Sequence, residues 1–129
     1  MRILCIDSDS NCLDFALRCM EWGHEVLWYD RPRKDGTLRL SGKGLVPKII
    51  DYDLLRTKFI DWADLIFIPD NNFYLEMLEP FRERGYPIYG CCEEAAKWEH
   101  DRATGQEAMK KAGLTTIPGV EFHDYDQAA

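Results

Sequence analysis

The sequence has no long hydrophobic run. Its longest uncharged apolar stretch is Leu65–Pro69, whereas a membrane-spanning helix needs about 20 apolar residues. Met1 and Arg2 lead directly into a short apolar run rather than into the hydrophobic region of a signal peptide. We therefore expect a soluble, cytoplasmic protein with no membrane partner.

Positive charge is also scarce. The chain has 16 Lys and Arg residues against 23 Asp and Glu residues, which gives a formal net charge of -7. No run of basic residues offsets this excess. Because a negative surface repels the phosphate backbone of DNA and RNA, we expect no nucleic-acid partner.

The five cysteines lack the spacing of a metal or redox motif, since the sequence has no CxxC and no histidine at zinc-finger distance. We predict no metal ligands and largely structural, reduced thiols. Cys12 and Cys91 are the candidates for a different role. Each lies near the start of a predicted helix, where the helix dipole can lower the pKa of a thiol and make it reactive.

The length of 129 residues sets a further limit. A chain of this size can bury a hydrophobic core without disulfides or a structural metal. An enzyme that handles several substrates usually needs a second domain to close over its site. We therefore expect one domain rather than a complete multi-substrate enzyme.

Short apolar runs alternate with segments of helical period. The patterns predict strands at residues 2–6, 25–29, 64–69 and 86–90, and helices at residues 13–22, 74–84, 93–98 and 101–112. Short connections between the first elements require a right-handed crossover and a parallel sheet. The predicted fold class is a three-layer, doubly wound, mostly parallel α/β sheet of four to five strands, similar to a Rossmann fold.

Three segments are less regular. Residues 31–48 show no clear period and hold several glycines and basic residues, which predicts a long loop or a small hairpin with a functional role. In the helix at 101–112, we expect Ala103, Ala108 and Met109 to face inward. A strand at 120–122 and the first turn of another helix at 126–129 complete the prediction.

Ligands of an open parallel sheet bind beyond the carboxyl ends of its strands. The residues expected there are Asp7–Asn11, Asp30, Asp70–Asn72 and Gly90–Cys92. The first of these loops reads DSDSN and lacks the GxGxxG pattern of a dinucleotide site, and its carboxylates would repel a pyrophosphate. Asp7, Asp9 and Ser10 are instead predicted to cap the following helix.

Two other uses of polar residues stay open. The runs MRILCIDSDS and DLIFIPDNN resemble those of a response-regulator receiver domain. That resemblance implies Mg²⁺ held by Asp7 and Asp9 and phosphorylation of Asp70, although Gly90 and Cys91 stand where a receiver has its Ser or Thr. Separately, Lys43 lies between Gly42 and Gly44, a combination that can cradle an anion.

A longer series of motifs runs through the second half of the chain. It comprises Ile68-Pro69-Asp70, Gly85-Tyr86-Pro87-Ile88-Tyr89-Gly90, Glu94-Ala95-Ala96-Lys97-Trp98-Glu99, Asp101-Arg102, Met109-Lys110-Lys111-Ala112-Gly113-Leu114, Pro118 and Phe122. This order resembles the amino-terminal part of the ATP-grasp ligases, and most of all phosphoribosylamine-glycine ligase of purine synthesis. Two departures from that family are the DSDSN loop in place of a glycine-rich turn and Arg102 in place of a lysine. Such drift would suit a divergent, phage-encoded member.

The resemblance implies that residues 1–99 form the substrate-side, pre-ATP-grasp domain and that residues 100–129 begin a truncated ATP-grasp region. The parent enzyme would use ATP and Mg²⁺ to join glycine, or a similar carboxylate, to phosphoribosylamine through an acyl phosphate. This fragment alone would hold no cofactor, no catalytic residue and no metal, and would need the missing C-terminal lobes as its partner. It would contribute one wall of the site for a phosphoribosylamine-like small molecule. That wall would be formed by Ser8, Ser10, Asn11, Lys43, Asp70, Asn71, Gly90 and Cys91.

Overall fold

The computed structural model describes residues 1–120, 122, 124 and 126. The chain divides into two compact units, Met1–Ala96 and Lys97–Ala129, and each is described by itself. The predicted strand at 120–122 and helical turn at 126–129 include residues 121 and 127–129, which lie outside the described residues. Within the described part of the chain, no helix is long and apolar enough to cross a membrane.

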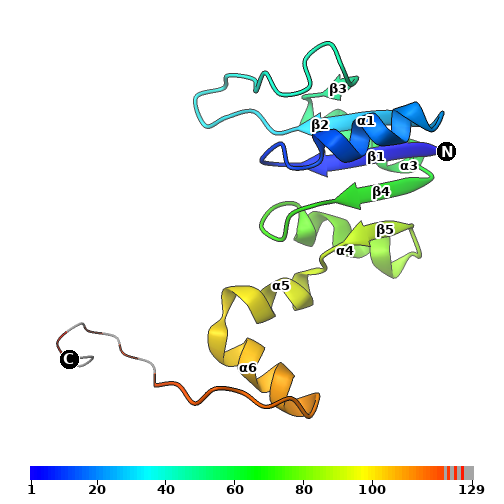
Figure 1. The fold of residues 1–129 in the computed structure, drawn as a ribbon. Coiled ribbons are helices and arrows are strands. Elements are labelled where there is room, and N and C mark those ends of the chain that lie inside the picture. Colours follow the sequence, from blue (N-terminus) through cyan, green and yellow to red (C-terminus); the bar gives the residue numbers. More distant parts are fainter. Residues whose placement is uncertain (121, 123, 125, 127–129) are drawn as a thin grey trace. The chain divides into compact units, whose positions relative to one another are not determined.

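The first unit is built on a five-stranded sheet in which every pairing is parallel (Figure 1). The strands are β1 (Arg2–Asp7), β2 (Glu25–Asp30), β3 (Lys48–Ile49), β4 (Leu65–Ile68) and β5 (Ile88–Gly90), in the order β3-β2-β1-β4-β5. The predicted α/β class and parallel sheet are confirmed. Strand β3 was not predicted, because a two-residue strand at the end of an irregular segment leaves no period to detect.

Helices follow most of the strands. They are α1 (Leu13–Glu21), α2 (Tyr52–Leu54), the π-helical turn η1 (Leu55–Phe59), α3 (Ile60–Trp62), α4 (Leu75–Glu83), α5 (Glu93–His100) and α6 (Arg102–Lys111). The helical segment from residue 52 to residue 62 was also missed from the sequence. Its buried side chains, Leu55 and Ile60, are five residues apart, a spacing that fits the π-helical turn rather than an α-helix.

The two faces of the sheet bury different residues because side chains alternate along each strand. On one face, Leu4, Ile6, Ile66 and Ile68 pack with residues of η1, α3 and α4. On the other face, the α1 face, Ile3, Cys5, Val26 and Trp28 pack with α1 and Val46. The first unit therefore has three layers, as predicted.

The second unit contains α6 and the end of α5. Its most buried described residue is Gly105, where an added Cβ would overlap the carbonyl oxygen of Trp98. The prediction that Ala103 and Met109 face inward is wrong, since both are exposed. Helix α6 contacts the end of α5 at Gly105, because the missing side chain lets the two helix backbones approach. The spacing of apolar residues in the sequence does not reveal such a position.

An ion pair between Arg2 and Asp64 joins the amino-terminal ends of the neighbouring strands β1 and β4. The Asp64 carboxylate accepts hydrogen bonds from the Arg2 backbone N–H at 2.7 Å and from Arg2 Nη2 at 2.7 Å. The Asp64 N–H donates to the Arg2 carbonyl oxygen at 2.8 Å. These bonds set the register with which β4 joins β1.

We expect Gly90→Ala to lower the free energy of unfolding by roughly 2–4 kcal/mol. Gly90 has φ +138°, and an added Cβ would overlap both the carbonyl oxygen and the side chain of Ile68. The matched control is Gly23→Ala, also at positive φ but in open space, which should cost about 1 kcal/mol. Urea unfolding of both variants provides the measurement, and equal losses would contradict the steric argument.

We also expect part of the stability to be lost between about pH 4 and pH 2. Hydrogen bonding from the Arg2 side chain lowers the pKa of Asp64 from its ordinary value of 3.8 to about 2. A lowered folded-state pKa stabilises the protein above the unfolded-state pKa, and this contribution disappears as the pH falls through the folded-state value. Asp64→Asn should therefore flatten the pH dependence of the urea midpoint in this range. Glu107→Gln, which removes an exposed carboxylate of α6, should leave the profile unchanged.

Candidate functional site

The carboxyl ends of the strands bring three aspartates to one edge of the sheet. Asp7 ends β1 and Asp30 ends β2, and the two are register partners in the parallel ladder. Asp70 follows β4 by two residues. The arrowheads of β1, β2 and β4 point to the same side in Figure 1. This carboxyl edge is the candidate site, as the sequence predicted for an open parallel sheet.

Asp7 is fully buried and ties the loop at residues 8–12 to the end of β1. Its Oδ2 accepts a hydrogen bond from the Cys12 N–H at 2.8 Å, and its Oδ1 accepts one from the Asp9 N–H at 3.1 Å. Helix α1 has no side-chain cap at its N-cap residue, Cys12. The predicted capping of the helix by Asp7, Asp9 and Ser10 is therefore wrong. The Asp7 carboxylate binds backbone N–H groups of the loop before the helix instead.

Asp70 connects the loop that follows β4 to the loop at residues 8–12. Its Oδ2 accepts a hydrogen bond from the Ser8 N–H at 3.3 Å, while its Oδ1 accepts from the N–H groups of Asn72 at 3.1 Å and Phe73 at 3.2 Å. Both carboxylate oxygens are thus engaged by backbone amides. Within the described residues, no group of three or more His, Cys, Asp or Glu is placed to hold a metal ion. No observation therefore favours the receiver alternative, with Mg²⁺ on Asp7 and Asp9.

The long loop at residues 31–47 reaches the same edge through Arg39. Arg39 Nη2 donates to Asp9 Oδ1 at 3.1 Å, and Arg39 Nε lies 3.7 Å from Asp30 Oδ1. Lys48 Nζ donates to Asp30 Oδ2 at 2.5 Å and to the Arg39 carbonyl oxygen at 3.2 Å. Two cations therefore neutralise the buried Asp30.

Arg39 and Lys48 were missed among the site residues. The sequence shows several basic residues in an irregular segment, with no period to distinguish them. Lys43 was selected because it has a glycine on each side. Lys43 is exposed in the turn at residues 41–45. The neighbouring Gly42 packs against the Trp28 ring on the α1 face, so the turn is anchored to the core rather than to the carboxyl edge.

A third cation flanks the edge. The Arg31 guanidinium carbon lies 4.2 Å from the centroid of the Phe73 ring, in the loop that Asp70 holds. Beside it, the hydroxyl groups of Tyr29 and Tyr74 are hydrogen bonded at 3.2 Å. Burial raises the pKa of both phenols, so they stay neutral and act as hydrogen-bonding groups.

Four polar side-chain atoms at the carboxyl edge are buried without a hydrogen-bond partner among the described residues. They are Ser8 Oγ, Ser10 Oγ, Asp30 Oδ1 and Arg39 Nε. An unsatisfied buried polar group costs about 1–3 kcal/mol. Ser10 is also one of two non-glycine residues with positive φ in the described chain, at 66°. Such a cluster is typical of a site that a polar ligand completes.

The other predicted site residues, which are Asn11, Asn71, Gly90 and Cys91, also lie at or after the carboxyl ends of strands. Asn11 is exposed and Asn71 is half-buried in the loop after β4. Gly90 ends β5 and Cys91 follows it, and Arg82 Nη2 donates to their carbonyl oxygens at 3.2 Å and 2.7 Å. Because β4 lies between β1 and β5, two strand spacings of about 4.8 Å separate this pair from the Ser8 loop.

The two candidate thiols differ in their surroundings. Cys12 is buried, and a hydrogen bond with Cys5 together with burial raises its pKa. The hypothesis of a reactive Cys12 is therefore wrong, because burial and neighbouring groups outweigh the helix dipole. Cys91 is partly exposed, and its Sγ donates to the Cys92 carbonyl oxygen at 3.3 Å.

We expect Asp7→Ala to lower the free energy of unfolding by roughly 2–3 kcal/mol, because the buried Cys12 N–H and the Asp9 N–H lose their acceptors. Asp7→Asn keeps one acceptor oxygen and should lose about half as much. Urea unfolding at neutral pH measures both. A neutral Asp7→Ala variant would show that the loop does not depend on this carboxylate.

No protein-family profile and no curated protein matches the sequence. Solved structures do match. The N5-carboxyaminoimidazole synthetase of Staphylococcus aureus aligns with a TM-score of 0.71 and 20% identity, over 98% of this chain and 34% of that chain. The N5-carboxyaminoimidazole ribonucleotide synthetase of Thermotoga maritima aligns with a TM-score of 0.64 and 16% identity, over 98% of this chain and 35% of that chain.

The corresponding enzyme of Thermus thermophilus aligns with a TM-score of 0.67 and 16% identity, over 90% of this chain and 31% of that chain. The chain thus spans about a third of the length of the solved structures it matches. All three of these proteins are N5-carboxyaminoimidazole or N5-carboxyaminoimidazole ribonucleotide synthetases. They are not phosphoribosylamine-glycine ligases, the group that the sequence motifs resemble most. At identities this low the comparison shows the fold alone, and the chain shares a Rossmann-like α/β fold with the matched part of these synthetases.

Proposed function

We propose that this chain is the substrate-side domain of an ATP-dependent carbon-nitrogen ligase and that its carboxyl edge binds the phosphoribosyl group of a small amine substrate. The observation that carries the proposal is a set of buried polar atoms without a hydrogen-bond partner among the described residues, namely Ser8 Oγ, Ser10 Oγ and Arg39 Nε. Arg39 Nε lies 3.7 Å from Asp30 Oδ1, outside hydrogen-bond distance. They gather at the sheet edge where open parallel folds bind ligands. The likeness to the N-terminal domain of N5-carboxyaminoimidazole ribonucleotide synthetases supports a ribonucleotide ligand.

The chemistry of the edge suits a phosphorylated sugar. Ser8 and Ser10 offer hydroxyl donors, while Arg31 and Arg39 offer charge. Two N–H groups of the first loop already donate to Asp7 and a third donates to Asp70. The phosphate would therefore be held by side chains, in contrast to a glycine-rich loop that uses its amides.

Binding of an anion requires Arg39 to exchange partners. Arg39 is held by Asp9, which is half-exposed, and lies next to Asp30, which Lys48 also neutralises. A phosphate oxygen can replace Asp9 as the partner of Arg39 at low cost, because an exposed ion pair contributes at most about 1 kcal/mol. Asp30 keeps Lys48 and would stay neutralised.

The identity of the amine distinguishes two versions of the proposal. Phosphoribosylamine, joined to glycine, is the substrate that the sequence motifs favour. A ribosyl aminoimidazole that receives a carboxyl group is the substrate that the solved structures favour. In both, a carboxyl carbon becomes bonded to an amine nitrogen carried by a ribosyl phosphate. ATP and Mg²⁺ would supply the activated carboxyl phosphate from lobes outside this chain, and this chain would orient the amine.

The test is a titration of the purified chain with ribose 5-phosphate, followed by isothermal calorimetry. We expect saturable binding, about tenfold weaker in Ser8→Ala because one charge-assisted hydrogen bond is lost. The unfolding free energy of this variant should not fall, since the removed hydroxyl has no partner in the folded chain. Ser41→Ala, in the turn at residues 41–45 away from the edge, is the matched control and should bind normally.

Three ligand controls separate the alternatives. Ribose should bind much more weakly than ribose 5-phosphate, and glycinamide ribonucleotide should compete with it. Absence of saturation by both phosphorylated sugars in a folded sample would overturn the proposal. Saturation by beryllofluoride with Mg²⁺ near stoichiometry would instead favour a phosphoacceptor role for Asp70.

A further inference from the structure

The α1 face of the sheet is covered over β1 and β2, only partly covered over β4, and open at Tyr89 of β5 in the unit Met1–Ala96. Ile3, Cys5, Val26 and Trp28 are buried beneath α1 and Val46. On the same face, Leu65 and Phe67 of β4 are only partly buried. Tyr89 of β5 is 69% exposed.

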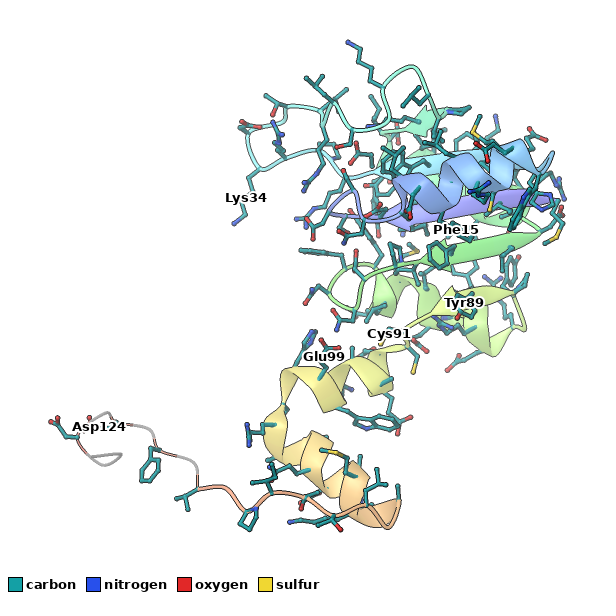
Figure 2. The ribbon with its side chains drawn as sticks, viewed as in Figure 1. Phe15, Lys34, Tyr89, Cys91, Glu99 and Asp124 are labelled. Atoms are coloured by element: carbon teal, nitrogen blue, oxygen red, sulfur yellow. The ribbon has the colours of Figure 1, made fainter. Side chains whose placement is uncertain are left out.

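Three neighbouring rings form an aromatic row, which consists of Phe15 of α1, Phe67 of β4 and Tyr89 of β5. Phe15 and Phe67 are partly buried, and Tyr89 is mostly exposed. The ring centroids of Phe15 and Phe67 are 4.2 Å apart. The rings of Phe67 and Tyr89 are stacked, with centroids 5.9 Å apart and an interplanar angle of 19°. Figure 2 shows Phe15 on α1 and Tyr89 on β5 on the same face of the sheet.

The topology explains why this half of the face is open. The crossover from β1 to β2 places α1 over those two strands. The chain then passes to the other side of β1 to form β4 and β5, and right-handed crossovers in that direction place their helices on the opposite face. Accordingly, residues of η1, α3 and α4 and Ala96 of α5 pack in the opposite core.

A parallel sheet is normally buried on both faces. Three neighbouring aromatic rings, two partly buried and one mostly exposed, have the composition of an interface core, which is depleted in charge and rich in aromatic residues. The Phe67 and Tyr89 rings are stacked, and the Phe15 ring is tilted by 34° against Phe67. The row lies on the α1 face of the sheet, whereas the polar atoms lie at the carboxyl ends of the strands. It therefore fits a protein surface rather than the small-molecule ligand.

We propose that the aromatic row is the docking surface for the polypeptide that carries the ATP-binding lobes, an inference that rests on the proposed function. The solved structures match 98% of this chain with only 34–35% of their own length, so about two thirds of each of those chains lies outside the match. A ligase needs those lobes held in a fixed position against the substrate-side domain. A permanent contact of this kind favours an apolar, aromatic surface.

The experiment compares hydroxyl-radical footprints of the 129-residue chain, at a concentration where sedimentation shows a monomer, and of the complete product of its natural gene. We expect Tyr89 and Phe67 to be oxidised about tenfold more slowly in the complete product, because a docked surface excludes solvent. Tyr52, which is exposed near the Tyr29 and Tyr74 rings of the opposite core, should react equally in both.

A variant checks the same surface independently. Tyr89→Glu should leave the unfolding midpoint of the 129-residue chain nearly unchanged, since the side chain is mostly exposed. In the complete product it should release the lobes and increase their cleavage by trypsin, while the control Tyr52→Glu should not. Ribose 5-phosphate should bind equally to the Tyr89→Glu variant and to the unmodified chain.

Three results would overturn the proposal. They are equal oxidation of Tyr89 in both polypeptides, protection of Tyr89 already present in the isolated monomer, and a natural product without further domains. Failure of the proposed function would show separately, as a lack of ribose 5-phosphate binding by the isolated chain. A dimer that protects Tyr89 would assign the row to a second copy of the chain instead.

Discussion

The buried Asp7 carboxylate is the constraint on which the candidate site depends. It lies at the end of the central strand and accepts hydrogen bonds from Cys12 and Asp9, so it fixes the path by which the chain leaves β1 and enters α1. A buried carboxylate is tolerated only when such partners satisfy it. The same bonds place Ser8 and Ser10 at the edge of the sheet and occupy amides that a phosphate would otherwise meet.

The neighbouring charges follow from this arrangement. Asp30 lies beside Asp7 in the ladder, and two buried carboxylates at one edge would repel each other without compensation. Lys48 and Arg39 supply that compensation and, in doing so, hold the edge strand β3 and the long loop at residues 31–47 against the sheet. The irregular segment is thus organised by electrostatics and not by a local turn motif.

The two faces of the sheet are covered to different extents. One face is covered by the helical segments before and after β4, and it forms the larger core of the first unit. The other face is closed beside α1 and carries the stacked rings of Phe67 on β4, which is partly buried, and Tyr89 on the edge strand β5, which is mostly exposed. The asymmetry arises from the strand order, because reversal of the winding direction at β1 places successive helices on opposite faces.

The sequence by itself determined the α/β class, four of the five strands, and the sheet edge at which polar residues gather. Apolar runs and helical periods encode these features locally. Only the tertiary structure decided that Arg39 and Lys48 lie at the carboxyl edge and that Lys43 is exposed in the turn at residues 41–45, since residues 18 and 30 positions apart meet at that edge through charge pairing. The roles of Asp7 and Cys12 were decided in the same way. Burial and hydrogen-bond partners set the properties of such groups, and neither can be read from spacing along the chain.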